Sequence, residues 1–129
     1  MQKRHWPISL RIQTKGGSSV TIFSKIIRGE LPCDKVFENE RIIAFKDIAP
    51  KAPVHLLIIP KKEIRDFQSI ASQDWSLISE CLQVAQQLAT QFGVAEGYRL
   101  VTNNGPRAGQ AVFHLHFHLM GGKQLGPMA

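Results

Sequence analysis

One stretch of the sequence decides the fold more than any other, Phe113-His114-Leu115-His116-Phe117-His118-Leu119-Met120. In this stretch, apolar residues alternate strictly with three of the five histidines of the chain. Strict alternation is typical of a half-buried β-strand. Side chains two apart share one face of a strand and lie roughly 6.6–6.8 Å apart along it. The stretch therefore predicts a strand over residues 113–120, with three imidazoles on one face and Leu115, Phe117 and Leu119 packed on the other.

Four further segments are predicted to be strands. Residues 54–59 are almost continuously apolar, which is typical of a central strand covered on both faces. Residues 36–38 and 41–45 flank a short polar turn and predict a hairpin. Residues 98–103 predict the last of these strands, and a loop rich in Asn and Gly separates it from the histidine stretch.

Two helices complete the predicted fold. Residues 21–29 carry apolar side chains at helical spacing, with Thr21 as the N-cap and Gly29 as the stop. Residues 73–92 carry a longer apolar stripe that recurs every three or four positions and ends before Gly93. The elements together predict a single α+β domain, with a mainly antiparallel five-stranded sheet, one long helix and one short helix.

The composition is that of one small globular domain. The chain has 129 residues, of which 43% are hydrophobic and 20% are charged, so it can bury a core. Residues 1–20 hold four of the sixteen basic residues and none of the ten acidic ones, so the net charge of +6 is concentrated there. The remainder is nearly neutral, which argues against a nucleic-acid-binding face. We expect residues 1–20 to be a flexible basic extension and residues 21–129 to be the folded domain.

The cellular setting is predicted from what the sequence lacks. No apolar run is long enough for a transmembrane helix, and the first residues do not resemble a secretion signal. The two cysteines, Cys33 and Cys81, form no closely spaced pair, so we interpret them as a reduced thiol and a core residue. These observations predict a cytoplasmic protein that binds neither a membrane nor a nucleic acid.

A row of imidazoles on one rigid element suits phosphoryl transfer, metal binding or a polar seam in the core. In phosphoryl transfer, a neutral histidine attacks phosphorus, and its second ring nitrogen is held protonated, most simply by a backbone carbonyl. His116 meets this need because its neighbours on the same face can hold the phosphate oxygens. The glycines and Arg107 of the preceding loop, residues 105–110, suit an anion. His55, taken alone, is more typical of a core histidine.

The motif over residues 114–120 resembles the His-φ-His-φ-His-φ-φ signature of the histidine-triad (HIT) superfamily, in which φ is apolar. Four other segments resemble its Hint branch, the purine nucleoside phosphoramidate hydrolases. They are residues 22–32, 44–50, 52–55 and 59–62. The resemblance covers the chain from about Thr21 to Lys123 and implies a single HIT-like domain.

The resemblance also implies a role for each matching residue. It makes His116 the nucleophile, His118 a phosphate contact, and His114 the residue whose carbonyl orients the nucleophile's ring. It makes His55 an auxiliary active-site histidine, and Asp47 the carboxylate that accepts hydrogen bonds from the ribose hydroxyls. The other residues that it assigns to nucleotide binding are Phe23, Ile26, Phe45 and Ile48 around the purine, and Asn103, Gly109, Gln110 and Ala111 on the phosphate side.

The activity that the resemblance implies is hydrolysis of the P–N bond of purine nucleoside 5′-phosphoramidates, such as AMP–amine and AMP–lysine adducts. The reaction would run through a nucleotidyl-histidine, with no cofactor or metal, in a homodimer with one continuous sheet. Ala111 replaces a serine hydroxyl common among relatives, and residues 124–129 lack a tryptophan seen in some, so both departures concern the leaving group. Three alternatives stay open: a dinucleoside polyphosphate hydrolase, a non-catalytic nucleotide-binding adaptor, and a zinc-binding protein that uses the His-x-His pairs.

Overall fold

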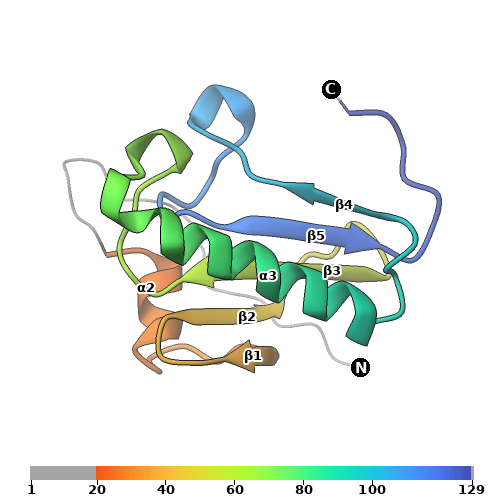
Figure 1. Ribbon diagram of the computed structural model, residues 1–129, viewed down its shortest axis with the longest axis horizontal. Coiled ribbons are helices and arrows are strands. Elements are labelled where there is room, and N and C mark those ends of the chain that lie inside the picture. The colour runs from red at the N-terminus through yellow and green to blue at the C-terminus, as the bar shows by residue number, and fades with distance from the viewer. Residues whose placement is uncertain (1–19, 129) are drawn as a thin grey trace.

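The computed structural model describes residues 20–128, in which one five-stranded sheet carries the long helix α3 across one face (Figure 1). All neighbouring strands are antiparallel. Across the sheet, the strands lie in the order β1 (Lys35–Glu38), β2 (Ile42–Lys46), β3 (Val54–Pro60), β5 (Phe117–Gly121) and β4 (Tyr98–Val101). The predicted α+β domain with its mainly antiparallel five-stranded sheet is thus confirmed.

Both predicted helices are present, and both end as expected. In α2 (Ile22–Ile27), the Thr21 hydroxyl accepts a hydrogen bond of 3.0 Å from a backbone N–H of the first turn. The helix stops at Gly29, which has a φ of 77°. In the same way, α3 (Trp75–Gln91) stops at Gly93, with a φ of 73°. Each glycine takes the left-handed conformation that closes a helix, so the predicted stops are confirmed.

Three short 3₁₀ turns lie between these elements: η1 (Phe67–Ser69), η2 (Ser72–Asp74) and η3 (Pro106–Ala108). The second of them occupies the first residues of the helix predicted over 73–92. The predicted extension over residues 1–20 lies outside the described residues except for Val20. Among residues 20–128, no helix has both the length and the apolar character needed to cross a membrane.

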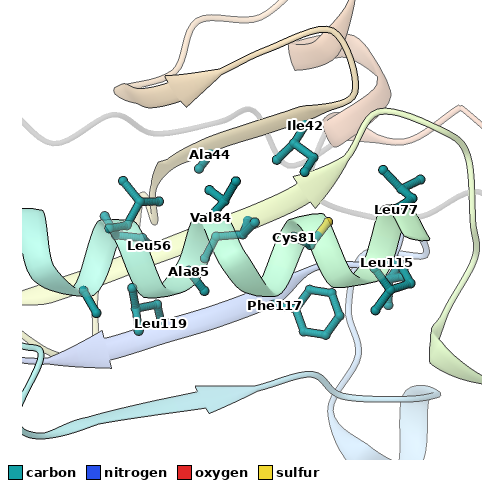
Figure 2. Packing of buried hydrophobic residues seen from close by; sticks show 14 of the residues in the cluster. Ile42, Ala44, Leu56, Leu77, Cys81, Val84, Ala85, Leu115, Phe117 and Leu119 are labelled. Carbon is teal, nitrogen blue, oxygen red and sulfur yellow. The ribbon is translucent and has the colours of Figure 1, made fainter. Parts of the chain in front are cut away.

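β3 is covered on both faces, as the apolar run over residues 54–59 predicted. Leu56 and Ile58 join the large apolar cluster beneath α3, which Figure 2 shows from close by. Leu57 and Ile59 point the other way and join a smaller cluster with α2. The side chains of a strand alternate between its two faces, so the sheet separates two apolar layers.

The histidine stretch is only partly a strand. β5 begins at Phe117, so the strand predicted over residues 113–120 is wrong for its first four residues. Continuing the register of β3 with β5 would set Pro60 opposite Leu115. Proline has no N–H to continue a ladder, and the N–H of Leu115 instead donates to the Ile64 carbonyl at 2.7 Å. The apolar residues of the stretch still pack in the cluster beneath α3, as predicted.

β4 is also shorter than the strand predicted over residues 98–103, because its ladder ends at Val101. The next residue extends the pairing with its side chain, since the Thr102 hydroxyl donates to the His116 carbonyl at 2.7 Å. The nucleophile candidate therefore lies just beyond the regular sheet. Individual hydrogen bonds, and not a continuous ladder, hold its backbone.

Candidate active site

Three histidine rings form a row on the face of the sheet that α2 covers. The ring centroids of His116 and His118 are 5.1 Å apart, and those of His118 and His55 are 5.3 Å apart. β3 supplies His55, and β5 supplies His118. The ring of His114 instead bonds to the Pro60 carbonyl. The prediction of a single row of the three motif histidines along one strand is therefore wrong, and His55 takes the third place in the row.

His116 is held in the tautomer that a nucleophile needs. Its Nδ1 lies 2.7 Å from the carbonyl oxygen of His114. A carbonyl oxygen can only accept, so Nδ1 must carry the proton, and Nε2 of the neutral ring keeps its lone pair. The side chain is 7% exposed. Burial lowers its pKa against the opposing effect of the His114 carbonyl, so the ring is neutral at pH 7.

His114 supports this arrangement from the core. Its Nε2 lies 2.7 Å from the Pro60 carbonyl, so this nitrogen donates a hydrogen bond. The residue is 2% exposed, and burial lowers the pKa of its ring. One residue thus joins the end of β3 through its ring and the ring of His116 through its carbonyl. The bond between the His114 carbonyl and the His116 ring is the one that the family resemblance implied, and the role of His116 as nucleophile stays a prediction.

A second chain of hydrogen bonds fixes the tautomers of His55 and His118. The backbone N–H of Lys51 donates to Nδ1 of His55 at 3.0 Å, so the proton of the neutral ring is on Nε2. That Nε2 lies 3.0 Å from Nδ1 of His118 and 3.4 Å from Oδ2 of Asp47. When it donates to His118, the proton of His118 must be on its own Nε2. His118 therefore presents an N–H at the site.

The charge state of His118 agrees with this assignment. Burial is the largest cause that lowers its pKa, and the neighbouring His116 and His55 lower it further, to about 4. Burial also lowers the pKa of His55. The row of rings is therefore neutral near pH 7, and it combines one free lone pair on His116 with one N–H on His118.

Asp47, His55 and His118 are also the one group among the described residues with a geometry that could hold a metal ion, because their candidate ligand atoms all lie within 4.8 Å of one another. A metal would need the lone pair of His55 Nε2. The proton would then move to Nδ1, where it would face the N–H of Lys51, a second donor only 3.0 Å away. These residues fit a hydrogen-bonded row better than a zinc site.

Beside the histidines, three of the four residues predicted to contact the purine, Phe23, Ile26 and Phe45, belong to one apolar cluster, here called the apolar floor. The ring of Phe23 meets the ring of His116 edge-on at 4.9 Å and that of Phe45 at 5.7 Å. Phe23, Ile26 and Phe45 are all buried, whereas Ile48 is half-buried. Asp47 lies at the edge of this floor, with Oδ1 fixed by a 2.8 Å bond from the N–H of Ala49. Their contacts with a nucleotide remain predictions.

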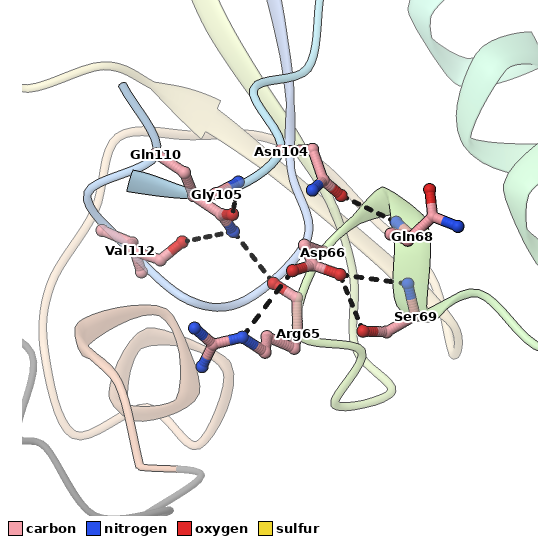
Figure 3. A network of polar contacts seen from close by, with 8 residues as sticks. All are labelled: Arg65, Asp66, Gln68, Ser69, Asn104, Gly105, Gln110 and Val112. Atoms are coloured by element: carbon pink, nitrogen blue, oxygen red, sulfur yellow. Dashed lines mark hydrogen bonds and ion pairs between the residues drawn. The ribbon is translucent and has the colours of Figure 1, made fainter. Parts of the chain in front are cut away.

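The residues predicted on the phosphate side lie in the loop between β4 and β5. Gly109 and Ala111 are exposed and Asn103 is half-buried, but Gln110 is only 4% exposed. The amide of Gln110 is engaged with backbone groups of its own loop and of the segment 64–69 (Figure 3). This segment was not among the residues predicted for the site. Its only local signal is Asp66, which caps the turn η1 by accepting from the N–H of Ser69.

Comparison with known protein families and sequences gives a consistent result. A family model described as the HIT domain matches residues 28–125. An uncharacterized HIT-like protein of Chlamydia muridarum is 55% identical over 118 residues, which cover 92% of this chain and 94% of that protein. The purine nucleoside phosphoramidase of Escherichia coli K12 is 46% identical over 109 residues, which cover 84% of this chain and 92% of that enzyme.

Solved structures show the same fold. A HIT family hydrolase from Legionella pneumophila superposes with a TM-score of 0.80 at 47% identity, covering 81% of this chain and 95% of that one. A HIT family hydrolase from Clostridium thermocellum also gives a TM-score of 0.80, at 49% identity, covering 83% of this chain and 94% of that one.

Proposed function

This chain belongs to the HIT family of hydrolases, and from that premise we propose that it cleaves the P–N bond of purine nucleoside 5′-phosphoramidates. One observation carries the proposal, namely the pair of fixed tautomers on adjacent rings. Nε2 of His116 has a free lone pair, and the neighbouring His118 presents an N–H. The centroids of the two rings are 5.1 Å apart. A nucleophile beside a donor fits attack on an anionic phosphorus centre, because the donor can stabilise charge on the phosphate oxygens.

The proposed reaction has two displacements. Nε2 of His116 attacks the α-phosphorus, the P–N bond of the substrate breaks, and the amine leaves with a proton. The ring then carries a positive charge, and its Nδ1–H remains bonded to the His114 carbonyl. Water next attacks the phosphorus, the bond to Nε2 breaks, and AMP is released with the ring neutral again. The sum is one phosphoramidate and one water converted to one AMP and one amine.

The proton for the departing amine is proposed to come from water. His118 is a hydrogen-bond donor with a low pKa, and its other nitrogen already accepts from His55. The chain behind it ends at the N–H of Lys51, a backbone amide that cannot resupply a proton. Ala111, on the leaving-group side, is exposed and carries no hydroxyl. Because none of these residues can supply the proton, we propose that a solvent water donates it to the amine.

The proposed partner is a purine nucleotide, with its base against the apolar floor and its ribose hydroxyls on Asp47. The Asp47 carboxylate is 17% exposed and can accept from two hydroxyls at once. A dinucleoside polyphosphatase or a non-catalytic adaptor could use the same pocket. The polyphosphatase is identified by comparing turnover of dinucleoside polyphosphates with turnover of phosphoramidates. The adaptor is identified by AMP binding without turnover.

A homodimer is also proposed, through the outer edge of β4, with which no other strand of residues 20–128 pairs. This strand ends the sheet, and its Tyr98 and Leu100 are 37% and 39% exposed. An unpaired edge with exposed apolar side chains can pair with a second copy to give one continuous sheet. Sedimentation of wild type and Leu100→Lys tests this, since the variant should sediment as a monomer.

The activity test is AMP release from adenosine 5′-phosphoramidate in excess EDTA, for wild type, His116→Ala and the exposed control Glu96→Ala. We expect turnover by wild type and by the control, and none by His116→Ala. AMP binding without turnover by the wild type would support the adaptor, and turnover only after zinc is added would support the metal alternative. Faster cleavage of diadenosine polyphosphates than of the phosphoramidate would assign the chain to that activity.

A further inference from the structure

The loop between β4 and β5 must place His114 and His116 without a β-ladder. It holds them through bonds to residues that lie far away in the sequence. The ring of His114 bonds to Pro60, the N–H of Leu115 to Ile64, and the carbonyl of His116 to the hydroxyl of Thr102. Two of these three contacts reach the end of β3 or the stretch that follows it. The position of the nucleophile therefore depends on how this stretch is joined to the loop.

Gln110 is one of the connections between the two, and its side chain makes three hydrogen bonds. Its Oε1 accepts from the N–H of Gly105 at 2.7 Å, and its Nε2 donates to the carbonyls of Arg65 at 2.9 Å and Val112 at 3.1 Å (Figure 3). All three partners are backbone groups. One buried amide thus joins the start of the loop, the segment 64–69 and the approach to His114.

These bonds leave Gln110 without a donor for a phosphate. A side-chain amide has two N–H hydrogens, and both are directed at carbonyl oxygens. Its oxygen is an acceptor, which would repel an anion. The resemblance assigned Gln110 to the phosphate side, but contact with a phosphate would require at least one of these buried bonds to break.

The segment on the other side of this connection is itself well ordered. Asp66 is 8% exposed, and its Oδ1 accepts from the N–H of Ser69 at 3.0 Å and from its hydroxyl at 2.7 Å. A second bond joins the segment to the loop, since the N–H of Gln68 donates to Oδ1 of Asn104 at 2.7 Å. Two hydrogen bonds therefore clasp the part of the loop over residues 103–112 to this segment, in addition to the Leu115–Ile64 bond.

We propose that Gln110 is a positioning residue, whose amide clasps the loop 103–112 to the segment 64–69 and thereby sets where His114 and His116 lie. It acts on the reaction through these histidines and not by touching the substrate. This inference rests on the proposed function for its effect on turnover, while the clasp itself can be tested without any substrate.

Removing the amide takes one hydrogen-bond partner from each of three backbone groups, on the buried Val112, the half-buried Gly105 and the exposed Arg65, and so removes the bonds that hold the loop in place. A displacement of about 1 Å at a reacting group can cost about 10²-fold in rate. The residues predicted around the nucleoside, Phe23, Phe45 and Asp47, make none of the clasp's hydrogen bonds, and only the side chain of Val112 joins the two through the apolar cluster. We therefore expect the loss to appear in kcat and not in nucleotide affinity.

The test compares Gln110→Met, which has a similar length and no amide, with the exposed control Gln83→Met on α3. The measurements are kcat and KM for adenosine 5′-phosphoramidate, the Kd for AMP, and amide hydrogen exchange of the ligand-free protein. For Gln110→Met we expect kcat to fall by about 10²-fold, the Kd for AMP to change less than about threefold, and the Gly105 amide to exchange faster while β3 stays protected. The control should match wild type in every measurement.

A Gln110→Met variant with normal kcat and weaker AMP binding would show a direct phosphate contact and overturn the proposal. Unchanged exchange at Gly105 would also overturn it. If the variant does not fold, Asn104→Ala opens the second clasp from an exposed position, and normal kcat with unchanged exchange at Gln68 would then overturn it. A wild type without turnover would refute the proposed function alone, because the exchange result would still decide whether the clasp exists.

Discussion

Replacing His55 with phenylalanine should disturb catalysis by freeing the tautomer of His118. In the native site, the N–H of Lys51 fixes the proton of His55 on Nε2, and His55 then donates to Nδ1 of His118 at 3.0 Å. Phenylalanine fills similar space but donates nothing. The ring of His118 is then free to move its proton to Nδ1, and the N–H that we propose for the phosphate is lost in that tautomer.

The size of the effect follows from the bond that is lost. An unpaired buried acceptor costs about 1–3 kcal/mol. A cost of that size at the transition state corresponds to a loss of about fivefold to about 150-fold in kcat/KM. His55 is also one of the causes that hold the pKa of His118 down to about 4, so that pKa should rise in the variant. Burial, the largest cause, remains.

The assay combines kinetics with long-range ¹H–¹⁵N correlation of the histidine rings, which identifies the protonated nitrogen of each. In the wild type we expect the proton on Nε2 of His55, His114 and His118, and on Nδ1 of His116. The matched control is His55→Gln, whose amide can still donate to His118 and should retain more activity. Wild-type His118 protonated on Nδ1, or equal losses in the two variants, would refute the reasoning.

Three further predictions concern stability and reactivity. As pH falls from 6.5 to about 4, His118 gains a proton in the unfolded chain but not in the native protein, so this residue should lower the free energy of unfolding by about 3 kcal/mol. Urea unfolding of His118→Gln should therefore depend less on pH than that of wild type. Equal pH dependence of the two proteins would contradict this. Gly93→Ala should lower the free energy of unfolding by about 1–2 kcal/mol, because φ is 73° at this position. The control is Gly97→Ala, where no neighbouring atom lies within 4 Å of the added carbon. Equal urea midpoints for the two variants would contradict the prediction. Cys81 is fully buried with a pKa raised to about 12, so a thiol reagent should label only Cys33 until the protein unfolds, and rapid labelling of both would contradict this.

Periodicity in the sequence predicted most of the fold because it reports local geometry. The apolar run over 54–59 is a strand covered on both faces, and the stripe over 73–92 is a helix whose bounds differ by at most two residues. Both signals depend on which sides of one element are buried. The caps at Thr21, Gly29 and Gly93 are local as well, and all three were predicted correctly.

The candidate active site was predicted less completely, because the contacts that hold its residues in place join distant parts of the sequence. The start of β5 depends on Pro60, which lies more than fifty positions earlier and cannot continue the ladder. The alternation of residues 113–120 carries no information about that partner. The same holds for the bond from Lys51 to His55 and for the support by the segment 64–69, since a backbone amide or carbonyl leaves no mark in a sequence.

The alternation of side chains along β3 links the register of strand pairing to the candidate active site. His55 and Leu57 face the site, while Leu56 and Ile58 face the helix α3. A slip of one residue in strand pairing would turn the histidine into the apolar layer and a leucine toward the candidate active site. A mispaired molecule would therefore lose both its core packing and the placement of His55 in the row of rings. The specific activity of a preparation should then measure the fraction of molecules whose strands are paired in register.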